Sequence, residues 1–195
     1  MCFKKKTKLF LDVDDTVFMS SEVVVDILNK RYKKNEDVND MWDYSYRSLF
    51  PETGEGEVDE IFSSKEFFEN VKVNPDFEEW YKKNKRKYDI TFVTKGTEEN
   101  LKRKESYLSK LFDAKFVGIP YHVSKGIVDM KGGVYVDDIC EYMCDSNAKL
   151  KIVLTNKRYT KYNKDVPSAD NILVAFDWKE IGEILDYYEN NHLLR

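Results

Sequence analysis

Three aspartates, Asp12, Asp14 and Asp15, lie within four positions at the end of an apolar run in the stretch KLFLDVDDTVF. Carboxylates this close repel one another, and removing them from water is expensive unless a cation or hydrogen bonds compensate. A buried strand that ends in such a cluster therefore indicates a site for a compensating partner.

Complementary groups stand at the ends of later segments. Thr94 ends the run DITFVT, and Lys125 begins a short helix in SKGIVD. Asp137 and Asp138 end the run GVYVDD. Ligands of open parallel sheets bind at the carboxyl ends of the strands. If the strands are neighbours, these side chains converge with Asp12 on one small site.

The carboxylates predict a magnesium site. A hard cation such as Mg²⁺ prefers carboxylate and carbonyl oxygens and water, and we expect Asp12 and Asp137 as its principal ligands. Asp14 and Asp138 are further candidates. Asp138 could bind directly or through water, or could equally be the cap of a helix formed by ICEYMC.

The same set of groups suits phosphoryl transfer. Asp12 can attack phosphorus, as carboxylates do in enzymes that form an aspartyl phosphate. Asp14 can protonate the leaving oxygen and later take a proton from water. Thr94 and Lys125 can hold the phosphate oxygens and offset their charge. Taken singly, Thr94 could cap the next helix and Lys125 could be a surface lysine, but their order along the chain favours the site.

Six short apolar runs supply the strands that would position these groups. They are rich in Val, Ile, Leu and Phe, as expected of strands buried on both faces. The runs are Leu9–Val13, Ile90–Val93, Phe116–Ile119, Val134–Val136, Lys151–Leu154 and Ile172–Phe176. Helical patterns between several of them predict an α/β fold, a Rossmann-like parallel sheet flanked by helices.

The helical patterns carry their own start signals. Ser21 and Thr97 are expected N-caps, and Pro75 is expected in the first turn of its helix. Leu108 and Leu111 should lie on the apolar side of the helix after Thr97, together with Leu101. The stretch WKEIGEILDYYENN predicts the last helix.

Residues 18–73 interrupt this alternation and predict a small helical cap inserted after the first strand. Residues 1–17 and 74–195 would then form the catalytic core. Phe18 directly follows the acidic loop, and we expect Phe18 and Trp42 to contact the substrate. The aromatic residues near Trp42 could be cap core, but the polarity of DVNDMWDYSYRSLF favours a surface on which a base stacks.

The motifs resemble those of a known superfamily. FLDVDDT is similar to the first motif of the haloacid dehalogenase-like (HAD) superfamily, an apolar strand followed by Asp-x-Asp-x-Thr. Thr94, Lys125 and the VDD sequence stand where its second, third and fourth motifs are expected. An aspartate at both position 12 and position 14 favours the phosphatases of the superfamily over its dehalogenases.

A closer resemblance is to the 5′(3′)-deoxyribonucleotidase-like family. The stretches SSKEFFENVKVNPDFEEWYKK, VSKGIVD, VYVDD and FDWKEIGEILDYY are similar to segments of that family. The chain departs from it at Asp15-Thr16, where the family often has Gly-Val. It also departs at Lys95-Gly96, where the family often has Ser-Pro.

The composition of the chain indicates its cellular compartment and argues against some classes of partner. A chain of 195 residues is long enough for one domain with a sizeable core. Its net charge of −4 argues against a nucleic acid or an anionic membrane as a partner. Three cysteines indicate a reducing compartment, and no window approaches the roughly 20 apolar residues of a membrane helix. We therefore expect a soluble cytoplasmic protein.

These observations and the resemblance imply a hydrolase, a Mg²⁺-dependent phosphomonoesterase that dephosphorylates (deoxy)ribonucleoside monophosphates. The residues themselves support only phosphomonoester hydrolysis, and the nucleotide comes from the resemblance. The rivals are a phosphatase for another small metabolite or a nucleic-acid 3′-phosphate, and a non-catalytic nucleotide-binding protein. These interpretations allow either a ribose or a deoxyribose sugar, any base, and either a monomer or a homodimer.

Overall fold

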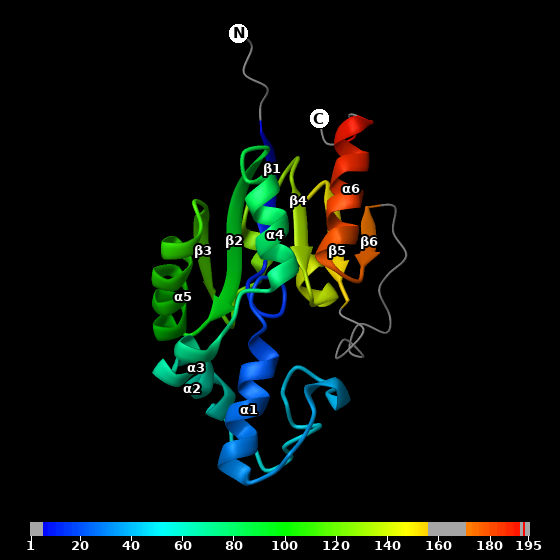
Figure 1. Cartoon of the computed structure of the whole chain (residues 1–195). Helices are drawn as coiled ribbons and strands as arrows, with labels where there is room; N and C mark the ends of the chain where they lie inside the picture. The colour runs from blue at the N-terminus through cyan, green and yellow to red at the C-terminus, as the bar shows by residue number, and fades with distance from the viewer. Residues whose placement is uncertain (1–5, 156–170, 192, 194–195) are drawn as a thin grey trace.

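Six parallel strands form the centre of the protein in the computed structural model, which describes residues 6–155, 171–191 and 193. The strand order is β3-β2-β1-β4-β5-β6, so β1 lies between β2 and β4 (Figure 1). The strands are β1 (Thr7–Leu11), β2 (Tyr88–Gly96), β3 (Lys115–Pro120), β4 (Val134–Asp137), β5 (Leu150–Leu154) and β6 (Ile172–Ala175). Each predicted run overlaps one of them, and the α/β fold is confirmed.

Successive residues of β1 point to opposite faces of the sheet. Leu9 and Leu11 join the larger core cluster, which includes residues of α4 (Pro75–Asn84), α5 (Glu98–Leu111) and α6 (Trp178–Asn190). Phe10 joins a second cluster with the segment that carries the short helices η2 (Lys125–Ile127) and η3 (Cys140–Met143). Both faces are covered, which explains continuous rather than alternating apolar runs.

Two of the three predicted helix starts are confirmed. Pro75 is the first residue of α4, and the side chain of Thr97 accepts a hydrogen bond from the backbone N–H of Asn100 at the start of α5. The prediction for Ser21 is wrong, because α1 (Ser20–Tyr32) already contains it and Met19 is the N-cap. The hydroxyl of Ser21 instead donates to the carboxylate of Asp15.

The buried stripe of α5 differs from the predicted one. Leu108 is buried as expected, but Leu111 is 49% exposed and Leu101 is half-buried. The other buried residues of the helix are Asn100 and Lys104, which lie eight and four positions before residue 108, respectively. Residues four apart share a helix face, so α5 turns a partly polar stripe toward the interior.

A second group of helices lies beyond the carboxyl ends of the strands (Figure 1). It comprises α1, η1 (Val38–Asp40), α2 (Glu57–Ser63) and α3 (Lys65–Asn70), and we call residues 20–70 the α1–α3 segment. The side chain of Asn100 on α5 donates to the carbonyl of Phe62 at 2.6 Å, and the hydroxyls of Ser63 and Thr97 lie 3.0 Å apart. These bonds join α2 to the sheet-bound helix α5.

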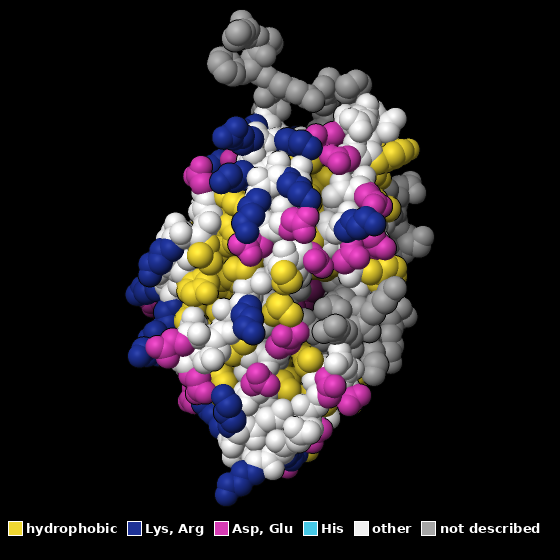
Figure 2. Space-filling model, in the orientation of Figure 1, with side chains coloured by type: hydrophobic (Ala, Val, Ile, Leu, Met, Phe, Trp, Pro, Cys, Tyr) yellow, Lys and Arg dark blue, Asp and Glu magenta, His cyan; other side chains and the backbone are white. Residues whose placement is uncertain are grey.

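Acidic and basic side chains are interspersed on the face shown in Figure 2. On α4 they form ion pairs one turn apart, between Lys82 and Glu78 at 2.7 Å and between Lys83 and Glu79. In the part of the chain that the structure describes, no helix has both the length and the apolar character required to span a bilayer.

An aromatic cluster joins α4, α5 and α6 to the sheet. The ring of Phe77 lies 4.7 Å from that of Trp178 and 5.4 Å from that of Phe112, measured between centroids. The indole N–H of Trp178 donates to the backbone carbonyl of Thr16 at 2.9 Å. The cluster therefore supports both the core and the loop that follows β1.

Phe77→Ala should lower the free energy of unfolding by about 3–5 kcal/mol, because a fully buried ring is replaced by a cavity. Chemical denaturation followed by circular dichroism measures this. Tyr187→Ala, which truncates a 61% exposed ring on α6, serves as the control and should change stability by less than about 0.5 kcal/mol. Equal losses in the two variants would contradict a core centred on Phe77.

Candidate active site

The loop after β1 presents its carboxylates at the edge of the sheet. The backbone N–H of Asp12 donates to the carbonyl of Val136 at 2.9 Å, which extends the pairing of β1 with β4 by one residue. The N–H groups of residues 17 and 18 then return to the carbonyl of Val13 at 2.9 and 2.8 Å. This tight turn keeps Asp12 and Asp14 at the strand end.

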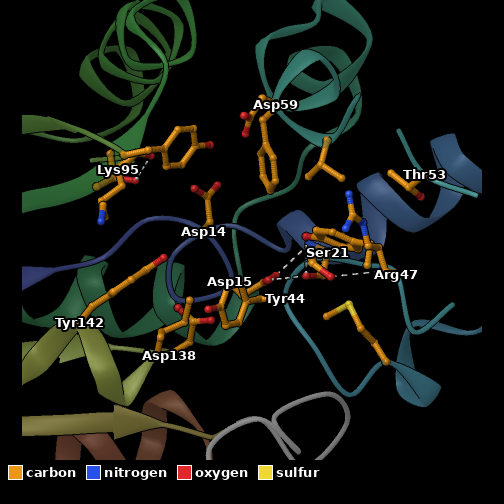
Figure 3. A pocket seen from close by; sticks show the side chains of 18 of the residues that line it. Asp14, Asp15, Ser21, Tyr44, Arg47, Thr53, Asp59, Lys95, Asp138 and Tyr142 are labelled. Atoms are coloured by element: carbon orange, nitrogen blue, oxygen red, sulfur yellow. Dashed lines mark hydrogen bonds between the residues drawn. The ribbon is translucent and has the colours of Figure 1, made fainter. Parts of the chain in front are cut away.

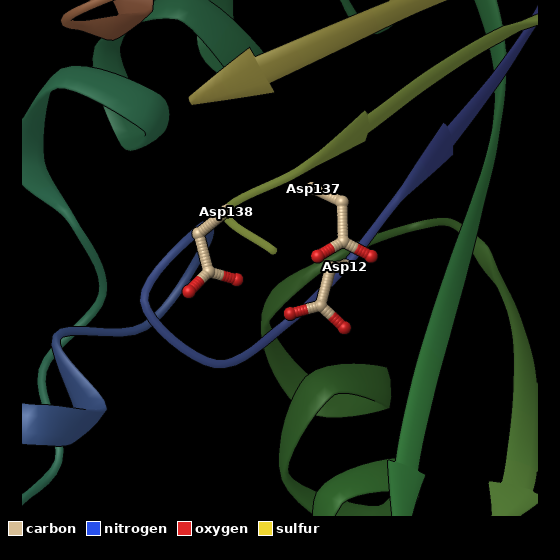
Figure 4. A group of neighbouring side chains, drawn as sticks. All are labelled: Asp12, Asp137 and Asp138. Atoms are coloured by element: carbon tan, nitrogen blue, oxygen red, sulfur yellow. The ribbon is translucent and has the colours of Figure 1, made fainter. Parts of the chain in front are cut away.

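Asp12, Asp137 and Asp138 form one acidic group (Figure 4). All three are buried, and each offers a carboxylate oxygen within 4.8 Å of those of the other two. The ammonium of Lys125 lies 2.5 Å from Oδ1 of Asp12 and 2.7 Å from Oδ2 of Asp137. Neighbouring parallel strands place the three carboxylates together, as the sequence predicts for this edge.

Burial disfavours the charged forms of two acids in this group, Asp12 and Asp138. Burial raises the pKa of Asp12 to about 7, against the opposing charge of Lys125. Burial, and after it the charges of Asp137 and Asp12, raise the pKa of Asp138 well above its usual range. Burial alone would lower the pKa of Lys125, but Asp12 and Asp137 raise it.

The group fits a divalent cation. It offers hard carboxylate oxygens, which Mg²⁺ prefers. The like charges of its members contribute to the raised pKa values of Asp12 and Asp138, and a cation would relieve this repulsion. Asp12, Asp137 and Asp138 are therefore the residues that could hold such an ion. The carboxylate of Asp14, also expected as a ligand, is not a member of this group.

Asp14 is bound by a different lysine, which sequence reasoning missed. Its Oδ2 contacts the ammonium of Lys104, and its Oδ1 accepts a hydrogen bond from the hydroxyl of Ser20 at 2.8 Å. The same ammonium lies 3.1 Å from the hydroxyl of Thr94. The available signal was a lysine on the stripe four residues before Leu108, where an apolar residue is expected.

A cavity of about 470 Å³ lies between the strand ends and the α1–α3 segment (Figure 3). Asp14, Lys95 and Tyr142 face it from one side, and Tyr44 and Arg47 face it from the other. Its lining also includes Asp12, Asp15, Thr94, Tyr121, Lys125 and Asp138 from the strand ends and the loops after them, and Ser21, Tyr46, Thr53, Asp59 and Phe62 from the α1–α3 segment.

Two residues expected to contact substrate do not line this cavity. Phe18 is 1% exposed, and its ring packs edge-on against Tyr107 with the centroids 5.5 Å apart. The turn after β1 directs it into the core, which corrects the expectation that its ring faces a substrate. Trp42 is 59% exposed and lies outside the lining, whereas Tyr44, two residues on, belongs to it.

Solved structures of HAD-like hydrolases share this fold. A haloacid dehalogenase-like family hydrolase from Streptococcus pneumoniae is 14% identical, with a TM-score of 0.61, over 94% of this chain and 98% of its own. YfnB from Bacillus subtilis, named as a HAD-hydrolase and bound to magnesium, is 13% identical, with a TM-score of 0.56. The match covers 93% of this chain and 99% of the YfnB chain.

A HAD family hydrolase from Deinococcus radiodurans, with bound phosphate and sodium, is 8% identical, with a TM-score of 0.57, over 92% of this chain and 95% of its own. The chain has the HAD-like fold. No protein-family model matches the sequence, and no curated protein matches it. At these identities the comparisons show a shared HAD-like architecture.

Mg²⁺ at saturating concentration should raise the melting temperature, because a ligand of the native state stabilises it by about 2.7 kcal/mol at 100 times its Kd, or roughly 5–10 °C here. Asp137→Asn should remove most of this shift. Asp89→Asn is the matched control, because Asp89 lies near the amino end of β2, away from the acidic group. This variant should keep the full shift in melting temperature. An undiminished shift in Asp137→Asn would contradict the metal group.

The affinity for Mg²⁺ should also fall as the pH is lowered from 8 to 6. A protonated carboxyl group is a poor metal ligand, and the pKa of Asp12 is raised to about 7, so the protonated form gains population across this range. Calorimetric titrations at pH 6, 7 and 8 measure the effect. Equal affinities at the three pH values would contradict it.

Proposed function

We propose that this protein is a metal-dependent phosphomonoesterase that hydrolyses nucleoside monophosphates. The observation that carries the proposal is the position of Asp12, at the end of β1, beside two further carboxylates and the Lys125 ammonium. Asp14 lies two residues on and faces the same cavity. The HAD-like fold and the order of the four motifs support this assignment.

In the proposed reaction, the Asp12 carboxylate attacks phosphorus and the bond to the leaving oxygen breaks. That oxygen takes a proton from Asp14, and Asp12 becomes an aspartyl phosphate. Water then attacks phosphorus and gives its proton to Asp14, which releases phosphate and restores Asp12. Thr94 and Lys125 bind the phosphate oxygens. A bound Mg²⁺, held by Asp12, Asp137 and Asp138, supplies positive charge that offsets the phosphate dianion.

The cavity supports a nucleotide as the substrate. Its volume of about 470 Å³ lies within the range of roughly 300–1,000 Å³ typical of small-molecule sites. Tyr44 and Phe62, both from the α1–α3 segment, bring aromatic rings to the cavity, where a base could stack. We propose that residues 18–73 act as the cap that selects the substrate, while the strand ends bind only metal and phosphate.

A phosphatase for another small metabolite is the second candidate. Arg47 lines the same cavity, and its guanidinium can bind a carboxylate or a second phosphate in bidentate fashion. A substrate with a second anionic group would use this residue, whereas a nucleoside monophosphate has no anionic group beyond its phosphate. Phosphate release across nucleotides and small phosphorylated acids separates the two candidates.

Asp12→Asn should abolish Mg²⁺-dependent phosphate release, because an amide is a poor nucleophile. Asp14→Asn should lower turnover of alkyl phosphates by about 10²–10⁴-fold, the usual contribution of general acid–base catalysis, and should affect an activated aryl phosphate much less. Asp26→Asn, an exposed acidic residue on α1, is the control. Full activity of the wild-type protein in excess chelator, or equal losses of Asp14→Asn on both esters, would contradict the mechanism.

Tyr44→Ala should lower kcat/KM for nucleotides roughly fivefold to 150-fold, because stacking of a base on an aromatic ring contributes about 1–3 kcal/mol. A small alkyl phosphate makes no such contact and should be hydrolysed at nearly the wild-type rate. Trp42→Ala is the matched control, since it truncates a neighbouring ring outside the cavity. Equal effects of the two variants, or of Tyr44→Ala on both substrates, would favour the metabolite phosphatase.

A further inference from the structure

Lys104 is a buried lysine whose three hydrogen-bond donors all have acceptors. Its side chain is 1% exposed although it lies on a helix. The ammonium contacts Oδ2 of Asp14, the hydroxyl of Thr94 at 3.1 Å and the carbonyl of Lys95 at 3.2 Å. Lysines are almost never fully buried without such pairing, because desolvation of the charge is expensive.

The contact with Lys104 completes the fixation of Asp14. The other carboxylate oxygen, Oδ1, accepts from the hydroxyl of Ser20 at 2.8 Å. The side chain of Asp14 nevertheless remains 25% exposed and faces the cavity (Figure 3). Two contacts from different elements, α1 and α5, therefore set the rotation of a carboxylate that a ligand can still reach.

The contact with Thr94 orients a hydroxyl. A hydroxyl group has one donor and two acceptor positions, and the ammonium of Lys104 occupies one acceptor position of Thr94. The hydrogen of Thr94 makes only a long contact, 3.4 Å, with the carbonyl of Lys95. It can therefore turn toward a phosphate oxygen in the cavity.

We propose that Lys104 is a positioning residue for phosphoryl transfer, which holds the carboxylate of Asp14 and the hydroxyl of Thr94 in one fixed geometry. This inference rests on the proposed function. Asp14 acts at the leaving oxygen and Thr94 at the phosphate, so their separation must match the distance between these atoms. A displacement of about 1 Å in such a site can lower a rate about 10²-fold. Lys104 acts through these two residues and does not itself touch the substrate.

The test compares Lys104→Met with Lys102→Met, an exposed lysine on the same helix. Both are assayed with an alkyl phosphate and with an activated aryl phosphate, in the presence of Mg²⁺. Lys104→Met should lower kcat for the alkyl ester about 10²-fold, at least tenfold more than for the aryl ester, with KM changed by less than about threefold. Lys102→Met should match the wild-type protein on both esters.

Two further variants separate positioning from a structural role. Lys104→Arg, which keeps the charge, should recover part of the lost activity. The Asp14→Asn/Lys104→Met double variant should be no slower than Asp14→Asn alone on the alkyl ester, because residues that act as a unit are not additive. Additive losses, or equal losses of Lys104→Met on both esters, would overturn the inference.

A structural readout keeps the test independent of activity. A crystal structure of Lys104→Met, or of Lys104→Gln if the first variant does not fold, should show the Asp14 and Thr94 side chains displaced while β1 and β2 are unchanged. Wild-type side-chain positions would overturn the role of Lys104. Absence of wild-type turnover with every phosphate ester would instead overturn the proposed function, since the displacement does not depend on turnover.

Discussion

The mutual repulsion of aspartates at one edge of the sheet is the constraint on which the rest of the site depends. The parallel pairing of β1 with β4, in which Leu11 lies opposite Val136, makes Asp12 a neighbour of Asp137 and Asp138. Buried charges of one sign are stable only beside compensating charge and hydrogen bonds. Within the described residues, two buried lysines contribute to this compensation, and the acidic group offers oxygens that could hold a cation.

The two lysines reach this edge from opposite faces of the sheet. Lys125 belongs to η2, within the segment that packs on the face bearing Phe10, and it pairs with Asp12 and Asp137. Lys104 belongs to α5, on the face bearing Leu9, and it pairs with Asp14. The proposed nucleophile and the proposed proton donor therefore contact different lysines, which come from different elements.

The two walls of the cavity are linked through buried polar groups. Asp15 (φ 53°) and Tyr46 (φ 63°) both adopt left-handed backbone conformations, which residues other than glycine rarely take. Ser21 joins them: its hydroxyl contacts the carboxylate of Asp15 and lies 2.9 Å from the Tyr46 hydroxyl. Aspartate tolerates this conformation. Unlike a glycine, the aspartate at position 15 also has a carboxylate, which binds Ser21 and so links the loop after β1 to the α1–α3 segment.

The sequence alone determined the parallel sheet and the acidic edge, because continuous apolar runs and strand-end carboxylates are local patterns. It also placed Thr94 and Lys125 at this edge, since parallel strands bring their carboxyl ends together. Only the tertiary structure decided which side chains complete the site. In the sequence, Lys104 looks like an ordinary exposed lysine of a helix, and only the packing of α5 on the sheet buries it. The sequence likewise suggests that Phe18 faces the cavity, whereas the turn after β1 directs its ring into the core. Such choices depend on how a helix is rotated and where a turn points, and these are set by contacts between segments distant in the sequence.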